Sequence, residues 1–106
     1  MKFNAIKMGH DIYFFDPETS DRTAAIQVSY SFNCFYSAFN PTVHDKKKAR
    51  DVIEPLKAAI AYMLRAYPLQ QESKDPLKAV PGNYVQFLKL MLSYATKHPD
   101  WNFYCD

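Results

Sequence analysis

Residues 43–67, VHDKKKARDVIEPLKAAIAYMLRAY, decide the fold because they predict one long amphipathic helix. Apolar side chains recur at steps of three or four residues along one face: Ala49, Val52, Ile53, Leu56, Ile60, Met63, Leu64 and Tyr67. The opposite face carries charged side chains: Lys46, Lys47, Arg50, Glu54, Lys57 and Arg65. Such a helix is stable only when its apolar face is covered, so another part of the chain must pack against it.

Two features define the start and the middle of this helix. Thr42 is expected to be the N-cap, and Asp45 three residues later resembles the acidic partner of a capping box. Pro55 falls inside the apolar stripe, where it removes a backbone donor and clashes with the preceding turn. We therefore expect a kink or break between about Asp51 and Glu54, with Asp51 capping a second helical piece.

Residues 24–36 predict the strand that covers the helix. Large or apolar side chains alternate along it: Ile26, Val28, Tyr30, Phe32, Cys34 and Tyr36. Small polar side chains fill the positions between them: Gln27, Ser29, Ser31 and Asn33. A period of two with one polar face is typical of an antiparallel strand that packs on the core with one side and meets water with the other.

Shorter apolar segments complete the sheet and the second helix. We expect strands at residues 2–8 and 11–15 with a turn at Gly9 and His10 between them, followed by a polar loop over residues 16–21.

After the long helix, residues 68–81 contain three prolines and indicate a connector. Asn83 is expected to cap a second helix over residues 84–97, and residues 101–105 predict a last strand. The fold class is therefore α+β, one two-layer domain over residues 1–106. It has a small, mainly antiparallel sheet and two helices packed on one face, in the order βββααβ.

Composition limits the class of protein. Eight Phe, eight Tyr and one Trp supply enough apolar area for a core without a metal or a disulfide. A net charge of +2 is too small to indicate nucleic acid or a membrane surface by itself. No signal-peptide pattern and no apolar run of membrane-spanning length are present, so we expect a cytoplasmic protein without membrane contact. Cys34 and Cys105 are then thiols, and a disulfide between them is expected only in an oxidising compartment.

A basic run near the predicted helix start is the candidate binding site: Lys46, Lys47, Lys48 and Arg50. Lysines at the N-terminal end of a helix oppose the helix dipole, at a cost of a few tenths of a kcal/mol each. One interpretation is an anion site, in which helix amides and lysines hold a phosphate or an acidic partner. The other is a solvated face, partly neutralised by Asp45, Asp51 and Glu54 at helical spacing.

The strand at residues 11–15 is apolar on both faces, because Ile12 and Phe14 point one way and Tyr13 and Phe15 the other. One of these pairs must lie outside the main core, where Tyr104 is expected to join it. An exposed aromatic pair more often marks a protein interface than a platform for bases. We therefore expect this patch to be covered by a second copy of the chain or by another protein.

No motif in the sequence indicates catalysis or a metal. The three His and two Cys lack zinc-ligand spacing, and phosphate-loop, nucleophile-elbow and dinucleotide-binding motifs are absent. Cys34 and His44 are a conceivable thiol and base, but Cys34 is expected on the apolar side of its strand. We therefore predict no catalytic residue, no metal ligand and no cofactor.

Residues 38–50, AFNPTVHDKKKAR, resemble a pattern in small uncharacterised phage-encoded proteins. There a strand leads into an Asn/Ser-Pro turn, an Asp, a Lys/Arg pair and a Gly-Arg at the head of a helix. In this chain Ala49 replaces the Gly, and the usual Phe between the Asp and the basic pair is missing. The resemblance implies a phage or mobile-element accessory protein that binds a host factor.

The sequence thus favours a non-catalytic binding protein that acts through contacts with another protein. A nucleic-acid-binding accessory protein that uses the basic helix start is the alternative, and a small hydrolase or transferase ranks third.

Overall fold

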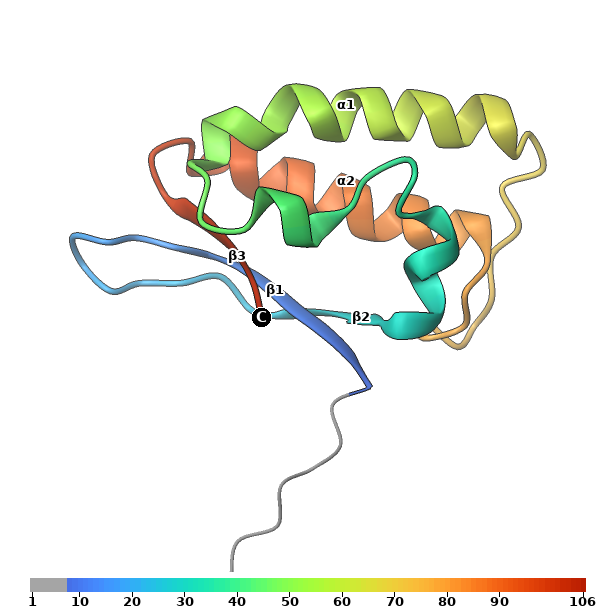
Figure 1. Ribbon diagram of the computed structural model, residues 1–106, viewed down its shortest axis with the longest axis horizontal. Helices are drawn as coiled ribbons and strands as arrows, with labels where there is room; N and C mark the ends of the chain where they lie inside the picture. Colours follow the sequence, from blue (N-terminus) through green and yellow to red (C-terminus); the bar gives the residue numbers. More distant parts are fainter. Residues whose placement is uncertain (1–7) are drawn as a thin grey trace, which may run out of the picture.

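Three antiparallel strands form the sheet, and two helices lie together on one side of it in the computed structural model (Figure 1). The strands are β1 (Gly9–Phe15), β2 (Ile26–Ser29) and β3 (Asn102–Cys105), with β1 in the centre of the order β2-β1-β3. The helices are α1 (Ala49–Ala66) and α2 (Pro81–Lys97), and two 3₁₀ helices, η1 (Tyr30–Phe35) and η2 (Pro41–His44), link β2 to α1. The predicted α+β class is confirmed.

The structure describes residues 8–106, so the strand predicted at residues 2–8 lies, apart from Met8, outside the described residues. The turn predicted at Gly9 and His10 is wrong, because both residues belong to β1. Gly9 lies opposite Ser29, and a Cβ on Gly9 would clash with the Val28 carbonyl oxygen. Glycine therefore serves here to let β1 and β2 approach, and not to form a turn.

The core lies between the inner face of the sheet and the two helices. The sheet contributes fully or almost fully buried side chains from all three strands: Ile12, Phe14, Ile26, Val28 and Phe103. The helices contribute a matching set: Val52, Leu56, Ala59 and Met63 from α1, and Tyr84, Val85, Leu88, Met91 and Ala95 from α2. The apolar stripe predicted for the long helix is thus the face that packs, although its members Ile60 and Leu64 are half-buried and exposed, respectively.

The strand predicted over residues 24–36 ends early. β2 stops at Ser29, whose side-chain oxygen accepts a hydrogen bond from the Ser31 amide (3.3 Å) and so caps η1. In a 3₁₀ helix, residues three apart share a side, so Phe32 and Phe35 are buried while Tyr30 is 44% exposed. The predicted alternation therefore fails after Val28.

The break predicted near Pro55 is wrong, because α1 runs unbroken from Ala49 to Ala66. Pro55 removes one backbone donor, but Val52 and Leu56 on either side of it are both fully buried. Packing of the apolar stripe thus holds the helix together across the missing bond. Asp51 lies in the first turn of α1, where its charge favours the helix dipole, and does not cap a second piece.

Asn83 ties the connector between the helices to the start of α2, which begins at Pro81 and not after Asn83. The buried side chain accepts a hydrogen bond from the Ser73 amide (3.2 Å) and donates to the carbonyls of Asp75 (3.0 Å) and Lys78 (2.9 Å). Its predicted role as helix cap is wrong. The Asn83 side chain instead supplies hydrogen-bond partners for three backbone groups of the connector, which has no regular backbone pairing there.

Truncation of the α1 stripe tests the core. We expect Leu56→Ala to lower the free energy of unfolding by about 2–5 kcal/mol, because Leu56 is fully buried between the helices and the sheet. The matched control is Leu64→Ala on the same helix, which should change it by less than about 0.5 kcal/mol because Leu64 is 46% exposed. Denaturant unfolding of both variants measures the difference, and equal effects would contradict the helix orientation.

Removal of the Asn83 amide tests the connector. We expect Asn83→Ala to lower the free energy of unfolding by about 1–3 kcal/mol, because three backbone groups of the connector lose their partner. Asn83→Asp keeps the acceptor for Ser73 but loses both donors, so it should also destabilise. Denaturant unfolding is the measurement, and wild-type stability in Asn83→Asp would exclude the assigned donor bonds.

Candidate binding surface

Three residues of the basic run, Lys46, Lys47 and Lys48, lie beside β3 and precede α1, whereas Arg50 belongs to the first turn of α1. Residues 46–48, called the basic segment below, run between η2 and α1 along the edge of β3. The Lys46 amide donates to the Phe103 carbonyl (2.7 Å), and the Phe103 amide donates to the Lys47 carbonyl (2.7 Å). Lys48 forms an antiparallel bridge with Asn102. The basic segment is therefore a short, fixed edge to the sheet.

The helix start predicted at Thr42 is wrong, because α1 begins at Ala49 with Lys48 in the cap position. The first two amides of α1 are occupied within the chain: Ala49 donates to the Trp101 carbonyl (2.7 Å) and Arg50 to the Pro99 carbonyl (3.0 Å). These amides are not available to a phosphate. The predicted combination of free helix amides with lysines around the helix end is therefore not present.

The four predicted cations fall into two groups. Lys48 is half-buried, with its Nζ donating to the Asp100 carbonyl (3.2 Å), and Arg50 forms an ion pair with the Asp100 carboxylate (3.1 Å). Lys46 and Lys47 are exposed, and Lys46 holds the left-handed φ of 71° that lets the chain leave η2 and join β3. Lys46 and Lys47 are thus the two exposed members of the run for which no contact with Asp100 is formed within the described residues.

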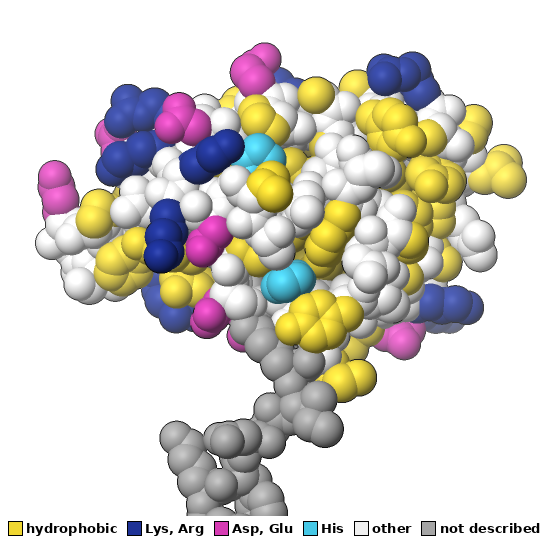
Figure 2. All heavy atoms as spheres, viewed as in Figure 1, with side chains coloured by type: hydrophobic (Ala, Val, Ile, Leu, Met, Phe, Trp, Pro, Cys, Tyr) yellow, Lys and Arg dark blue, Asp and Glu magenta, His cyan; other side chains and the backbone are white. Residues whose placement is uncertain are grey.

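An open cleft of about 430 Å³ lies between the hairpin loop after β1 and the start of α1, and it is lined by Asp16, Pro17, Glu18, Lys48, Arg50, Asp100 and Trp101. Asp16 accepts hydrogen bonds from the Glu18 amide and the Thr19 hydroxyl, and these bonds lower the pKa of its carboxyl. Figure 2 shows basic and acidic side chains interspersed over this end of the molecule, where α1 begins. The cleft is therefore of mixed charge and is not an anion pocket.

The sequence predicted that either Ile12 and Phe14 or Tyr13 and Phe15 would lie outside the core, and the structure places Tyr13 and Phe15 there. Ile12 and Phe14 are fully buried in the core, so they cannot be contact residues. Tyr13 and Phe15 lie on the other side of the sheet, where the Tyr13 ring stacks on Tyr104 with centroids 5.5 Å apart. The Phe15 ring meets Tyr104 edge-on at 6.0 Å. The side of the sheet that carries Tyr13, Phe15 and Tyr104 is called the outer sheet face below.

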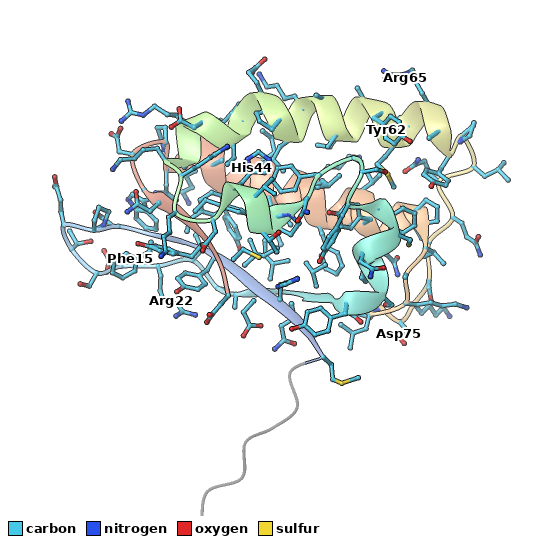
Figure 3. All side chains as sticks on the ribbon, viewed as in Figure 1. Phe15, Arg22, His44, Tyr62, Arg65 and Asp75 are labelled. Carbon is cyan, nitrogen blue, oxygen red and sulfur yellow. The ribbon has the colours of Figure 1, made fainter. Side chains whose placement is uncertain are left out.

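Two cations join the outer sheet face through strand pairing. Residues directly opposite one another in antiparallel strands share a face, and Phe15 lies opposite Asn102 on one side and Arg22 on the other. Asn102 in turn lies opposite Lys48. The Arg22 guanidinium is 4.3 Å from the centre of the Tyr13 ring, and Figure 3 shows Phe15 and Arg22 at the same end of the hairpin. Sequence reasoning missed Arg22, because only the pairing shows that it returns to this face.

The candidate thiol and base have different surroundings. Cys34 is exposed on η1, with its thiol donating to the Ser31 carbonyl (3.5 Å), so its predicted place on the apolar side of a strand is wrong. His44 stacks on Phe39 with ring centroids 4.6 Å apart, and its Nδ1 is 3.3 Å from Lys47 Nζ. Over residues 8–106, no three His, Cys, Asp or Glu side chains come together as potential metal ligands.

His44 makes the stability of the domain depend on pH. Burial, and then the charge of Lys47, lower the pKa of His44 from 6.5, so the unfolded chain binds more protons than the folded chain as the pH falls. The contribution of His44 to the free energy of unfolding is therefore full above about pH 7 and is lost as the pH falls from the unfolded pKa through the lower folded pKa. We expect the parent to lose more stability than His44→Phe over this range in denaturant unfolding. If the parent and His44→Phe lose the same free energy of unfolding between these pH values, the lowered pKa of His44 is contradicted.

Comparison with known proteins gives no family for this chain: no protein-family model, no curated protein and no solved structure matches it. Among the helices of residues 8–106, none is both long enough and apolar enough to cross a membrane. Function is therefore inferred from the surfaces themselves.

Proposed function

We propose that this protein is a non-catalytic binding protein that contacts an acidic surface of a protein partner through Lys46 and Lys47. The observation that carries the proposal is the fixed position of these two lysines. Their backbone is hydrogen-bonded to Phe103 on β3, and both side chains are exposed. A partner would bind a cationic edge whose backbone is already ordered, and this reduces the entropic cost of association.

Charge supports the same surface. Within the described residues, the ion pairs join Arg50 to Asp100 and Lys57 to Glu54, and neither includes Lys46 or Lys47. Two neighbouring ammonium groups without a carboxylate in contact attract an acidic surface, chiefly by raising the association rate.

The resemblance of residues 38–50 to small phage-encoded proteins suggests the kind of partner. It supports an accessory protein that acts in the cytoplasm of a bacterial host by binding a host protein. In this stretch Asn40 accepts a hydrogen bond from the Thr42 amide (3.1 Å), and Pro41 begins η2, which delivers the chain to the basic segment.

A purely structural role for the lysines is the competing explanation. Lysines on an exposed edge prevent strands of other molecules from pairing there, and the basic segment is such an edge. If the lysines have only this role, reversing their charge should not affect the binding of a partner. If they form the proposed contact, reversing their charge should weaken the binding of a specific partner.

A second candidate is binding of single-stranded nucleic acid on the outer sheet face. Aromatic rings on an open sheet, flanked by cations, are the general means by which proteins stack single-stranded bases. Tyr13, Phe15 and Tyr104 would supply the rings, with Arg22 and Lys48 at the two sides. Such binding should weaken steeply between about 50 and 200 mM salt.

Charge reversal tests the proposed function. A host protein retained by the immobilised chain would be purified, and its affinity would be measured for the parent, for Lys46→Glu/Lys47→Glu, and for the control Lys89→Glu/Lys97→Glu, which reverses two exposed lysines on α2. We expect the first variant to lose at least about tenfold in affinity, mainly through slower association, and the control to bind like the parent.

Circular dichroism should show the parent fold in both variants. Unchanged affinity of Lys46→Glu/Lys47→Glu would contradict the proposal and leave the lysines with the structural role. Steeply salt-dependent binding of a single-stranded oligonucleotide, lost in Tyr13→Ala, would favour the second candidate instead.

A further inference from the structure

The outer sheet face ends in a pair of carboxylates at the end opposite to Arg22 and Lys48. Asp11 on β1 lies opposite Asp106, with the Asp106 amide donating to the Asp11 carbonyl (2.9 Å) and the Asp11 amide to the Asp106 carbonyl (3.2 Å). Directly opposed residues share a face, so the two carboxylates are neighbours. Like charges in this position destabilise a sheet, and within residues 8–106 neither carboxylate is in an ion pair.

Charge on the outer sheet face therefore changes sign along the strands. Arg22 and Lys48 flank Phe15 at one end, and Asp11 and Asp106 form the other end. Phe15 and Asp11 are four residues apart on β1, which corresponds to roughly 13 Å along the strand. The stacked rings of Tyr13 and Tyr104 lie between the two ends.

This arrangement is complementary to itself. A two-fold axis that lies in the plane of the face and crosses the strands at the Tyr13 and Tyr104 row would reverse the strand direction of a second copy. The cationic end of each copy would then lie over the acidic end of the other, and each contact would occur twice. The aromatic rings of both copies would pack at the centre, as in protein interfaces whose buried centre is rich in Tyr, Phe and Arg.

We propose that the outer sheet face binds a second copy of this chain as a symmetric homodimer. The cations of one copy then neutralise the opposed carboxylates of the other, and the half-buried rings of Tyr13, Phe15 and Tyr104 become fully buried. A nucleic acid would bring phosphates against Asp11 and Asp106, so it fits the face less well. The inference does not depend on the proposed function, because Lys46 and Lys47 take no part in this contact.

Charge reversal on one side of the contact, and then on both, provides the test. The mass of the parent, of Arg22→Asp, of Asp11→Arg and of an equal mixture of the two variants is measured by sedimentation over a range of concentrations. The parent should reach twice its 12.3 kDa at high concentration. Each variant alone should dimerise at least about tenfold more weakly, because like charges then face each other at both contacts.

The mixture should regain the dimer, because both contacts between Arg22→Asp and Asp11→Arg again join opposite charges. Arg65→Asp is the matched control, since Arg65 lies on α1 far from Phe15 and Arg22 (Figure 3), and it should dimerise like the parent. Lys46→Glu/Lys47→Glu should also keep the dimer, so that failure of this inference and failure of the proposed function are separate results.

Three outcomes would overturn the inference, with circular dichroism confirming that each variant is folded. They are a parent that stays monomeric at every concentration, a dimer that survives Arg22→Asp unchanged, and a mixture that stays as monomeric as its components. A monomeric parent that binds a single-stranded oligonucleotide through Arg22 would assign the face to nucleic acid instead.

Discussion

The backbone pairing between β3 and the chain that leads into α1 is the constraint on which the rest of the structure depends. Asp45 accepts a hydrogen bond from the Cys105 amide (2.9 Å), and the next five residues supply four backbone bonds to residues 99–103. These bonds fix where α1 starts, and they turn Lys46 and Lys47 outward on an ordered edge. They also cover the edge of β3, which would otherwise present free backbone groups for association.

The same arrangement leaves one side of the sheet uncovered. Both helices lie on one side of the sheet (Figure 1), where Ile12 and Phe14 are fully buried. Tyr13 and Phe15 lie on the other side of the sheet and are half-buried. The described part of the molecule therefore presents two distinct surfaces: the exposed lysines Lys46 and Lys47 beside β3, and the outer sheet face, which has cations at one end and carboxylates at the other.

Local periodicity was enough to predict those parts of the fold in which one pattern continues. The apolar stripe of α1, the alternation at Ile26 and Val28, and the two-sided character of residues 11–15 all follow from it. The predictions are wrong where the end or start of an element depends on hydrogen bonds that the local pattern does not reveal. Ser29 ends β2 by capping η1, and the start of α1 depends on bonds to residues about 50 positions away in the chain. For the same reason Arg22 could not be placed on the outer sheet face before the strand pairing was known.

Amide hydrogen exchange measures the central constraint most directly. The amides of Lys46, Ala49, Phe103 and Cys105 all donate across this pairing, so they should exchange as slowly as amides in the centre of β1, although Lys46 lies in a polar, exposed segment. The amide of Lys48 is not one of these donors, because the hydrogen bonds of Lys48 are formed by its carbonyl and its side chain. Its exchange rate therefore serves as the internal comparison for a neighbouring amide that does not donate across the pairing. If Lys46 and Ala49 instead exchange at the rate of a solvated loop, the basic segment is not fixed to β3, and the pairing cannot be what positions α1 and the two lysines.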